Sequence, residues 1–131
     1  MFQFKVKVYY EDTDSGGVVY YANYLKFIER ARTDLIQRLG FSLNQLMIDF
    51  DSLFVVKKFE CEYLSSAKLE DELTVITKVV EIKNASFTLE QSIKRISKII
   101  FNSKILMVCI NSDGRPTKIP KKLSDILEKN V

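Results

Sequence analysis

Apolar and polar residues alternate at the start of the chain, and the pattern then changes to a helical period. The segment FQFKVKVYY, residues 2–10, places apolar side chains at alternate positions, which predicts a strand with one solvated face. Across residues 22–40 the apolar residues recur every three to four positions, which predicts a long amphipathic helix. Asn23 is a plausible N-cap for this helix, and Gly40 is a good stop signal.

The second half of the chain returns to a period of two. A short helix at 41–49, capped by Ser42, is expected before this change. Strands rich in Val, Ile, Thr and Phe are then expected at residues 52–65, 71–84, 85–97 and 98–114. The joints between the later strands are short, so the four strands are expected to form an antiparallel meander. Residues 119–131 predict a final helix with Pro120 near its start.

This order of elements predicts an α+β domain that spans residues 1–131. One helix of about five turns covers one face of a five-stranded sheet only if the sheet curls around the helix. The remaining apolar edge or face of the sheet then needs a partner subunit. An oligomer built by joining sheets or stacking helices is therefore expected.

Composition and charge narrow the class of protein. The 131 residues include 20 Lys and Arg and 17 Asp and Glu, which are interspersed and give a net charge of +3, so nothing signals nucleic-acid binding. No apolar run is long enough to span a bilayer, and the first residues lack the apolar core of a signal peptide, so a cytoplasmic protein is expected. Cys61 and Cys109 are expected to be small buried residues rather than a disulfide or metal ligands.

The chain contains no histidine, which removes Ser-His-Asp and Cys-His catalysis and histidine metal sites. Carboxylates remain the best candidates for acid, base or nucleophile. Asp12 and Asp14 lie where the first strand gives way to a turn with Gly16 and Gly17 before the long helix. Unpartnered N–H groups at a helix start favour an ionised carboxylate and stabilise a developing oxyanion. A plain polar turn is the alternative interpretation of these residues.

Residues 8–32, VYYEDTDSGGVVYYANYLKFIERAR, resemble the signature of the 4-hydroxybenzoyl-CoA thioesterase family. They look most like the branch of small bacterial acyl-CoA thioesterases linked to the Tol–Pal envelope system. Weaker agreement continues in FVVKK at 54–58, in the A-x-x-x-D-x-L pattern at 67–73 and in Pro-Lys at 120–121. The resemblance implies the hotdog fold, in which a curled antiparallel sheet wraps a long helix. It also implies a homotetramer of sheet-joined dimers, with each site at a subunit interface.

The resemblance further implies hydrolysis of an acyl- or aryl-CoA to free acid and coenzyme A, without a separate cofactor or a metal. By motif position, Asp14 is the expected nucleophile or general base, and the backbone N–H of Tyr21 is expected to polarise the thioester carbonyl. Asp12 is then expected to hold the turn together. The expected substrate-binding residues are Gly17, Val19, Tyr20, Tyr24, Lys57, Lys83 and Ser86.

Some of these residues have alternative roles. Lys57 and Lys83 are candidates to meet the coenzyme A phosphates, but a solvated charge on a strand is an equally good interpretation of each. For Tyr20 and Tyr24, packing in the core is the better expectation.

Relatives in this branch commonly carry histidine at the position of Tyr21. This departure motivates a rival hypothesis, in which the chain is a non-catalytic hotdog scaffold that binds acyl-carrier protein or an envelope partner. A hotdog dehydratase is disfavoured because it is expected to use a catalytic histidine. Glu29 and Arg32 are expected to pair on the helix in a structural role.

Overall fold

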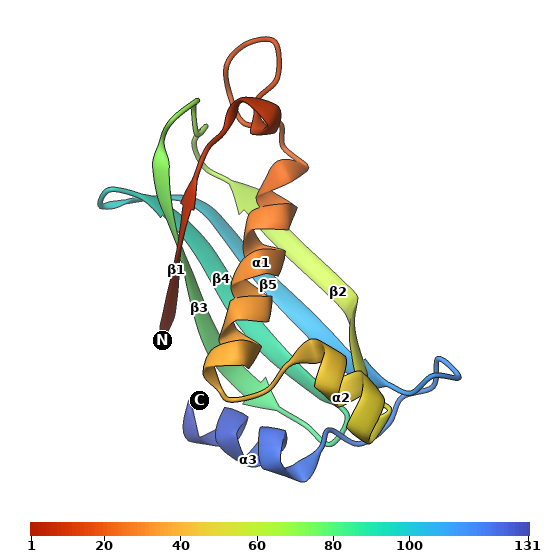
Figure 1. The fold of residues 1–131 in the computed structure, drawn as a ribbon. Helices are drawn as coiled ribbons and strands as arrows, with labels where there is room; N and C mark the ends of the chain where they lie inside the picture. Colours follow the sequence, from red (N-terminus) through yellow and green to blue (C-terminus); the bar gives the residue numbers. More distant parts are fainter.

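The computed structural model describes residues 1–131 and contains one five-stranded sheet that curls around a long helix (Figure 1). The strands are β1 (Phe2–Lys7), β2 (Leu53–Tyr63), β3 (Glu72–Ile82), β4 (Ser86–Arg95) and β5 (Lys98–Ile110). The helices are α1 (Asn23–Arg38), α2 (Leu43–Phe50) and α3 (Lys121–Lys129), and a 3₁₀ turn covers Tyr10–Asp12. The predicted α+β class, with α1 against one face of the sheet, is confirmed.

The strand order is β1-β3-β4-β5-β2, and every neighbouring pair is antiparallel. The short joints of the β3–β4 and β4–β5 hairpins are confirmed. The prediction of a four-strand meander is wrong for β2, which pairs with β5 at the edge opposite β1. Its connection to β3, residues 64–71, is too long for a tight hairpin and crosses the end of the sheet. Hydrogen bonds hold the backbone of this connection at both of its ends. Leu64 N–H donates to the Ile100 carbonyl, and the Asp71 carbonyl accepts Val8 N–H, both at 2.9 Å.

The helix boundaries follow the predictions with one exception. Ser42 caps α2, because its hydroxyl accepts the N–H of the residue three positions on at 3.0 Å. Gly40 ends α1 with a φ of +94°, which favours glycine. Asn23 is not the N-cap of α1, because Ala22 occupies that position with dihedrals already close to helical. The Asn23 amide instead donates back to the Asp12 carbonyl at 2.8 Å.

The first strand and the last helix are both shorter than predicted. β1 ends at Lys7 rather than at residue 10, because the chain then turns into the 3₁₀ turn. α3 begins directly after Pro120 and buries Leu123 and Leu127, which confirms the predicted final helix. None of the helices combines the length and the apolar character that crossing a membrane requires.

The core lies between α1 and the sheet. α1 buries Tyr24, Phe27, Ile28, Ala31, Leu35 and Ile36. The sheet supplies Leu73, Val75, Val79, Leu89, Ile93, Phe101 and Ile105, among others. Each fully buried large apolar side chain contributes about 1.5–3 kcal/mol. Packing against the sheet therefore stabilises α1 more than helix propensity does.

One polar network crosses this core beneath α1. The buried Gln91 of β4 donates to the Ile28 carbonyl at 2.9 Å and to the Thr77 hydroxyl at 3.0 Å. It also accepts a hydrogen bond from the Arg32 guanidinium at 3.0 Å. The expected ion pair between Arg32 and Glu29 does not form, because the guanidinium turns inward to the Gln91 amide. Burial lowers the pKa of Arg32, and the charge of Glu29 acts in the opposite direction.

Both cysteines are free thiols. Cys109 is fully buried in β5, and this burial raises the pKa of its thiol, while Ser52 acts in the opposite direction. Cys61 on β2 is partly exposed and packs against the core. The expectation of a buried apolar role therefore holds for Cys109 and only in part for Cys61.

Replacing Gln91 with alanine tests the importance of the polar network. The Thr77 hydroxyl, the Ile28 carbonyl and the Arg32 guanidinium would each lose a partner in the core. We expect the free energy of unfolding to fall by about 2–4 kcal/mol in urea titrations followed by circular dichroism. Gln3→Ala, on the exposed side of β1, is the matched control and should change stability by less than about 0.5 kcal/mol. Equal losses in the two variants would contradict this assignment.

Candidate active site

The segment between β1 and α1 forms a loop at one end of the sheet, the end at which β2 finishes and β3 begins (Figure 1). The loop is fastened to the β2–β3 connection at Ala67. Val19 N–H donates to the Ala67 carbonyl at 2.8 Å, and Ala67 N–H donates to the Tyr24 hydroxyl at 3.0 Å. Because all three residues are buried, the core fixes the position of this loop.

Asp12 closes the turn at the start of the loop, as expected. Its carboxylate accepts Tyr9 N–H at 2.9 Å, and only 7% of the residue is exposed. Its carbonyl accepts Tyr20 N–H at 3.0 Å and the Asn23 side chain at 2.8 Å. The Asp12 carboxylate is therefore nearly buried and held in the turn through Oδ2, and its carbonyl links the turn to the first residue of α1.

Asp14 lies exposed in the same loop with half of its carboxylate free. Oδ1 accepts Gly16 N–H at 2.8 Å and lies 3.4 Å from the Val18 nitrogen, while Oδ2 accepts no hydrogen bond from the chain. A Cβ at Gly16 would stand 3.2 Å from Oδ1, and Gly17 has a φ of +81°, so both positions favour glycine. A carboxylate that is held through one oxygen and free at the other is suited to act as a nucleophile or base.

The start of α1 offers two backbone donors. Tyr21 N–H and Ala22 N–H have no acceptor in the chain, whereas Val19 N–H and Tyr20 N–H are both bonded. Unpartnered N–H groups at a helix start can stabilise a developing oxyanion. The structure thus leaves free the donor predicted at Tyr21 and adds a second one at Ala22. Val19, predicted to contact substrate, has its side chain in the core.

Aromatic rings surround these donors. Tyr24 is 3% exposed and stacks on Phe101 with ring centroids 5.4 Å apart, which favours its core role. Tyr20 and Tyr21 are exposed, and the phenol of Tyr21 raises the pKa of Tyr20. Sequence reasoning missed the role of Tyr63, whose hydroxyl donates to the Tyr21 carbonyl at 2.9 Å. The only available signal was an aromatic residue at a strand end, because its partner lies 42 residues away.

The predicted phosphate-binding residues lie far from Asp14 within one chain. Lys83 and Ser86 flank the β3–β4 hairpin, where Lys83 N–H donates to the Ser86 carbonyl at 2.8 Å. β3 has 11 residues and runs from the Asp14 end of the sheet to this hairpin, which spans roughly 35 Å. Lys57 is exposed on the edge strand β2, at a bulge. A single chain therefore does not bring the lysines to the carboxylate.

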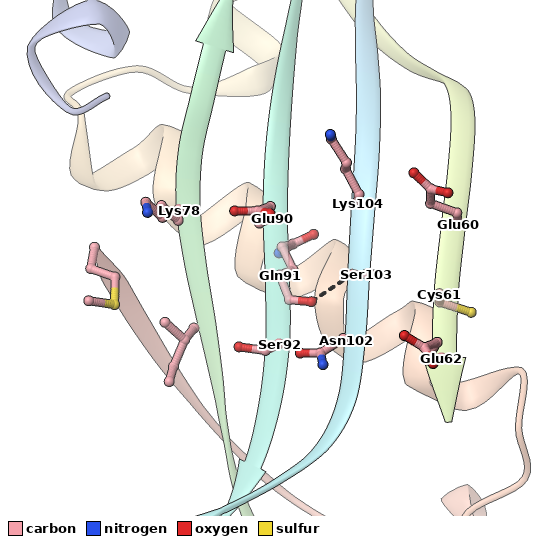
Figure 2. Close-up of a pocket in the computed structure, with 12 residues that line it drawn as sticks. Glu60, Cys61, Glu62, Lys78, Glu90, Gln91, Ser92, Asn102, Ser103 and Lys104 are labelled. Carbon is pink, nitrogen blue, oxygen red and sulfur yellow. Dashed lines mark hydrogen bonds between the residues drawn. The ribbon is translucent and has the colours of Figure 1, made fainter. Parts of the chain in front are cut away.

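A hollow of about 560 Å³ lies on the face of the sheet that points away from α1 (Figure 2). A row of charges from four strands crosses it, in the order Lys78, Glu90, Lys104 and Glu60. Neighbours in this row have opposite signs and lie directly opposite each other on adjacent strands, an arrangement that suits a solvated sheet face. No residue of the loop between β1 and α1 lines this hollow.

A second cavity, of about 270 Å³, lies between α1, α2 and the β2 side of the sheet. Eight of its 11 lining residues are hydrophobic, and they include Phe54, Val56 and Met107. Glu29 and Arg32 supply polar atoms on the α1 side. An apolar chamber with a few polar groups is the usual composition of a small-molecule pocket. No group of three acidic or cysteine side chains is placed to hold a metal ion.

Residues 16–98 match the thioesterase superfamily, which is more than half of the chain. The chain therefore belongs to this superfamily, and the sheet curled around α1 is the hotdog fold. Its relatives include small bacterial acyl-CoA thioesterases. The acyl-CoA thioesterase YbgC of Haemophilus influenzae is 41% identical over 123 residues, which covers 93% of this chain and 90% of that protein. The Helicobacter pylori YbgC is 34% identical over 133 residues, with 94% and 97% covered.

A solved structure agrees with this assignment. The crystal structure of a probable thioesterase from Bartonella henselae has a TM-score of 0.88 and 32% identity. The alignment covers 91% of this chain and 98% of that one. The predicted family resemblance and the predicted hotdog fold are both confirmed.

The two aspartates are expected to differ in their effect on stability. Asp12→Ala removes a nearly buried acceptor of Tyr9 N–H and should lower the free energy of unfolding by about 1–2 kcal/mol. Asp14→Ala removes only local, exposed bonds and should cost less than about 0.5 kcal/mol. Guanidinium titrations of both variants make the comparison. A larger loss for Asp14→Ala would contradict these roles.

Proposed function

We propose that this chain is an acyl-CoA thioesterase that hydrolyses acyl- or aryl-CoA to free acid and coenzyme A. The observation that carries the proposal is the Asp14 carboxylate, with Oδ2 free, in the loop that also presents the unpartnered Tyr21 N–H. Membership of the thioesterase superfamily and the acyl-CoA thioesterases among its relatives support the same reaction.

Two routes through Asp14 fit this arrangement. In the first, the carboxylate attacks the thioester carbonyl, the C–S bond breaks and coenzyme A leaves as its thiolate, and water then hydrolyses the acyl–Asp14 anhydride. In the second, Asp14 takes a proton from a water molecule as that water attacks the carbonyl, and the C–S bond then breaks so that the acid is formed and coenzyme A leaves as its thiolate. In both routes the oxygen of the thioester becomes negative and receives a hydrogen bond from Tyr21 N–H. Neither route needs a cofactor or a metal.

A thioester suits a site without histidine. It is more electrophilic than an ester or an amide, so a carboxylate suffices as nucleophile or base. In this proposal Tyr21 contributes its backbone N–H, and a histidine side chain at that position is not required. The exposed rings of Tyr20 and Tyr21 would lie beside the acyl group.

The complete site in this proposal lies between two subunits of a cytoplasmic homotetramer, a dimer of dimers. β2 is an edge strand, and Val55 and Val56 on it are 40% and 48% exposed. α2 next to it exposes Met47 and Ile48. An exposed apolar edge of this kind favours strand pairing with a second copy. Antiparallel pairing through β2 would reverse the partner and turn its Lys83 hairpin toward the Asp14 end.

Within that assembly, the acyl group, the thioester and the phosphates of the substrate would each contact a different part of the protein. The apolar cavity of about 270 Å³ would accept an aliphatic or aromatic acyl group. Lys57 and Lys83, with Ser86, would meet the phosphates of coenzyme A or of an acyl-carrier protein. Gly17 would let the backbone approach the thioester closely.

Replacing Asp14 with asparagine tests the reaction. The amide keeps the size of the side chain but cannot attack or take up a proton, so turnover on an acyl-CoA panel should fall at least about 100-fold. Asp113→Asn, in the exposed turn after β5, is the matched control and should keep wild-type turnover. Release of free thiol is the measurement.

Two results would contradict the proposed reaction. Wild-type turnover in the Asp14 variant would remove that residue from the mechanism. No turnover by the wild type on any acyl-CoA or acyl-carrier substrate, with binding of a carrier protein retained, would favour the rival scaffold function.

The assembly is tested by light scattering. The wild type should have the mass of a tetramer, and Val56→Lys should shift it toward smaller species, because a charge then enters the proposed β2 junction. Ile96→Lys, in the β4–β5 hairpin and 92% exposed, is the matched control and should leave the mass unchanged. A monomeric wild type would contradict the proposal.

A further inference from the structure

Tyr63 connects the sheet to the loop that carries the candidate site. It is the last residue of β2 and lies opposite Phe101 of β5, with ring centroids 5.2 Å apart. Its ring is also 5.4 Å from that of Tyr24 and 6.4 Å from that of Tyr21. Because Tyr24 and Phe101 are buried, the core fixes the Tyr63 ring, although 45% of Tyr63 is exposed.

The Tyr63 hydroxyl bonds one particular peptide group. It donates to the Tyr21 carbonyl at 2.9 Å, and no other hydrogen bond in the chain involves the peptide between Tyr21 and Ala22. Two bonds from Ala67 of the β2–β3 connection, at Val19 and Tyr24, hold residues on either side of that peptide. Partial burial is the main cause that raises the pKa of Tyr63, so its hydroxyl remains a donor at neutral pH.

The geometry of a peptide makes this bond relevant to catalysis. All peptide bonds here are trans, so the Tyr21 carbonyl and the Ala22 N–H lie in one plane and point in opposite directions. Holding the carbonyl therefore fixes the direction of the Ala22 N–H. A carbonyl that accepts a hydrogen bond also polarises its peptide and makes the N–H a better donor. The Tyr21 N–H belongs to the preceding peptide, whose Tyr20 carbonyl accepts Asn23 N–H at 2.8 Å, so that donor is held separately.

We propose that Tyr63 is a positioning residue, whose hydroxyl holds the Tyr21 carbonyl and thereby orients the Ala22 N–H group, beside the Tyr21 N–H, toward the oxygen of a bound thioester. The inference rests on the proposed thioesterase function. It assigns the orientation of the Ala22 donor to residue 63 on β2 rather than to the side chain at position 21. The donors then depend on the backbone of residue 21, which accommodates tyrosine there.

The test is Tyr63→Phe, which removes the hydroxyl and keeps the ring that packs on Tyr24 and Phe101. We expect kcat to fall about tenfold, with KM within twofold of wild type and the melting temperature within a few degrees. Tyr10→Phe is the matched control, since Tyr10 is 83% exposed and its hydroxyl makes no hydrogen bond. Wild-type kcat in Tyr63→Phe, or a change confined to KM, would overturn the proposal.

Amide NMR separates this role from the proposed reaction. In ¹H–¹⁵N spectra, Tyr63→Phe should shift the Ala22 cross-peak strongly and the Val19 cross-peak little, because only the peptide at Ala22 loses a hydrogen bond. An unchanged Ala22 cross-peak would overturn the role of Tyr63 even in an active enzyme. If the wild type hydrolyses no acyl-CoA while the Ala22 cross-peak shifts, the orienting bond is supported and the thioesterase function fails.

Discussion

The backbone of Ala67 is the constraint on which the candidate site depends. Its carbonyl accepts Val19 N–H and its own N–H donates to the Tyr24 hydroxyl, so these two bonds hold the residues before and after Tyr21. Ala67 has no exposed surface, so its backbone lies within the core. The residue reaches this position because the β2–β3 connection crosses the end of the sheet. A hairpin between β2 and β3 would have left the loop before α1 without this partner.

The chemistry follows from how the loop uses its polar groups. Asp12 is nearly buried: its Oδ2 accepts Tyr9 N–H, and its carbonyl accepts hydrogen bonds from the loop and from α1. Asp14 is held through Oδ1 alone, and Tyr21 and Ala22 keep their N–H groups free. A chain without histidine thus still presents an unengaged carboxylate oxygen and unengaged backbone donors in one loop. A thioester requires little more, because its carbonyl is already activated.

Local features were predictable from the sequence, and long-range ones were not. The period of the apolar residues located α1, the Ser42 hydroxyl marked the start of α2, and short joints identified the later hairpins, because each depends on neighbours a few residues apart. The crossing of β2 to the far edge depends on contacts between distant segments, and no local pattern encodes it. The inward turn of Arg32 to Gln91 and the bond from Tyr63 to Tyr21 join residues 59 and 42 positions apart.

The separation of Asp14 from Lys83 places a condition on any assembly that acts on coenzyme A thioesters. The two residues lie at opposite ends of β3, and the fold of one chain cannot shorten that distance. Parallel pairing of two β2 edges would keep the two Lys83 hairpins together at one end and both Asp14 loops at the other. Antiparallel pairing reverses one sheet, so that each Asp14 end lies alongside the hairpin end of the partner. In the proposed assembly the same pairing would cover the long exposed edge of β2, so one contact would serve both the stability of the sheet and the completion of the site.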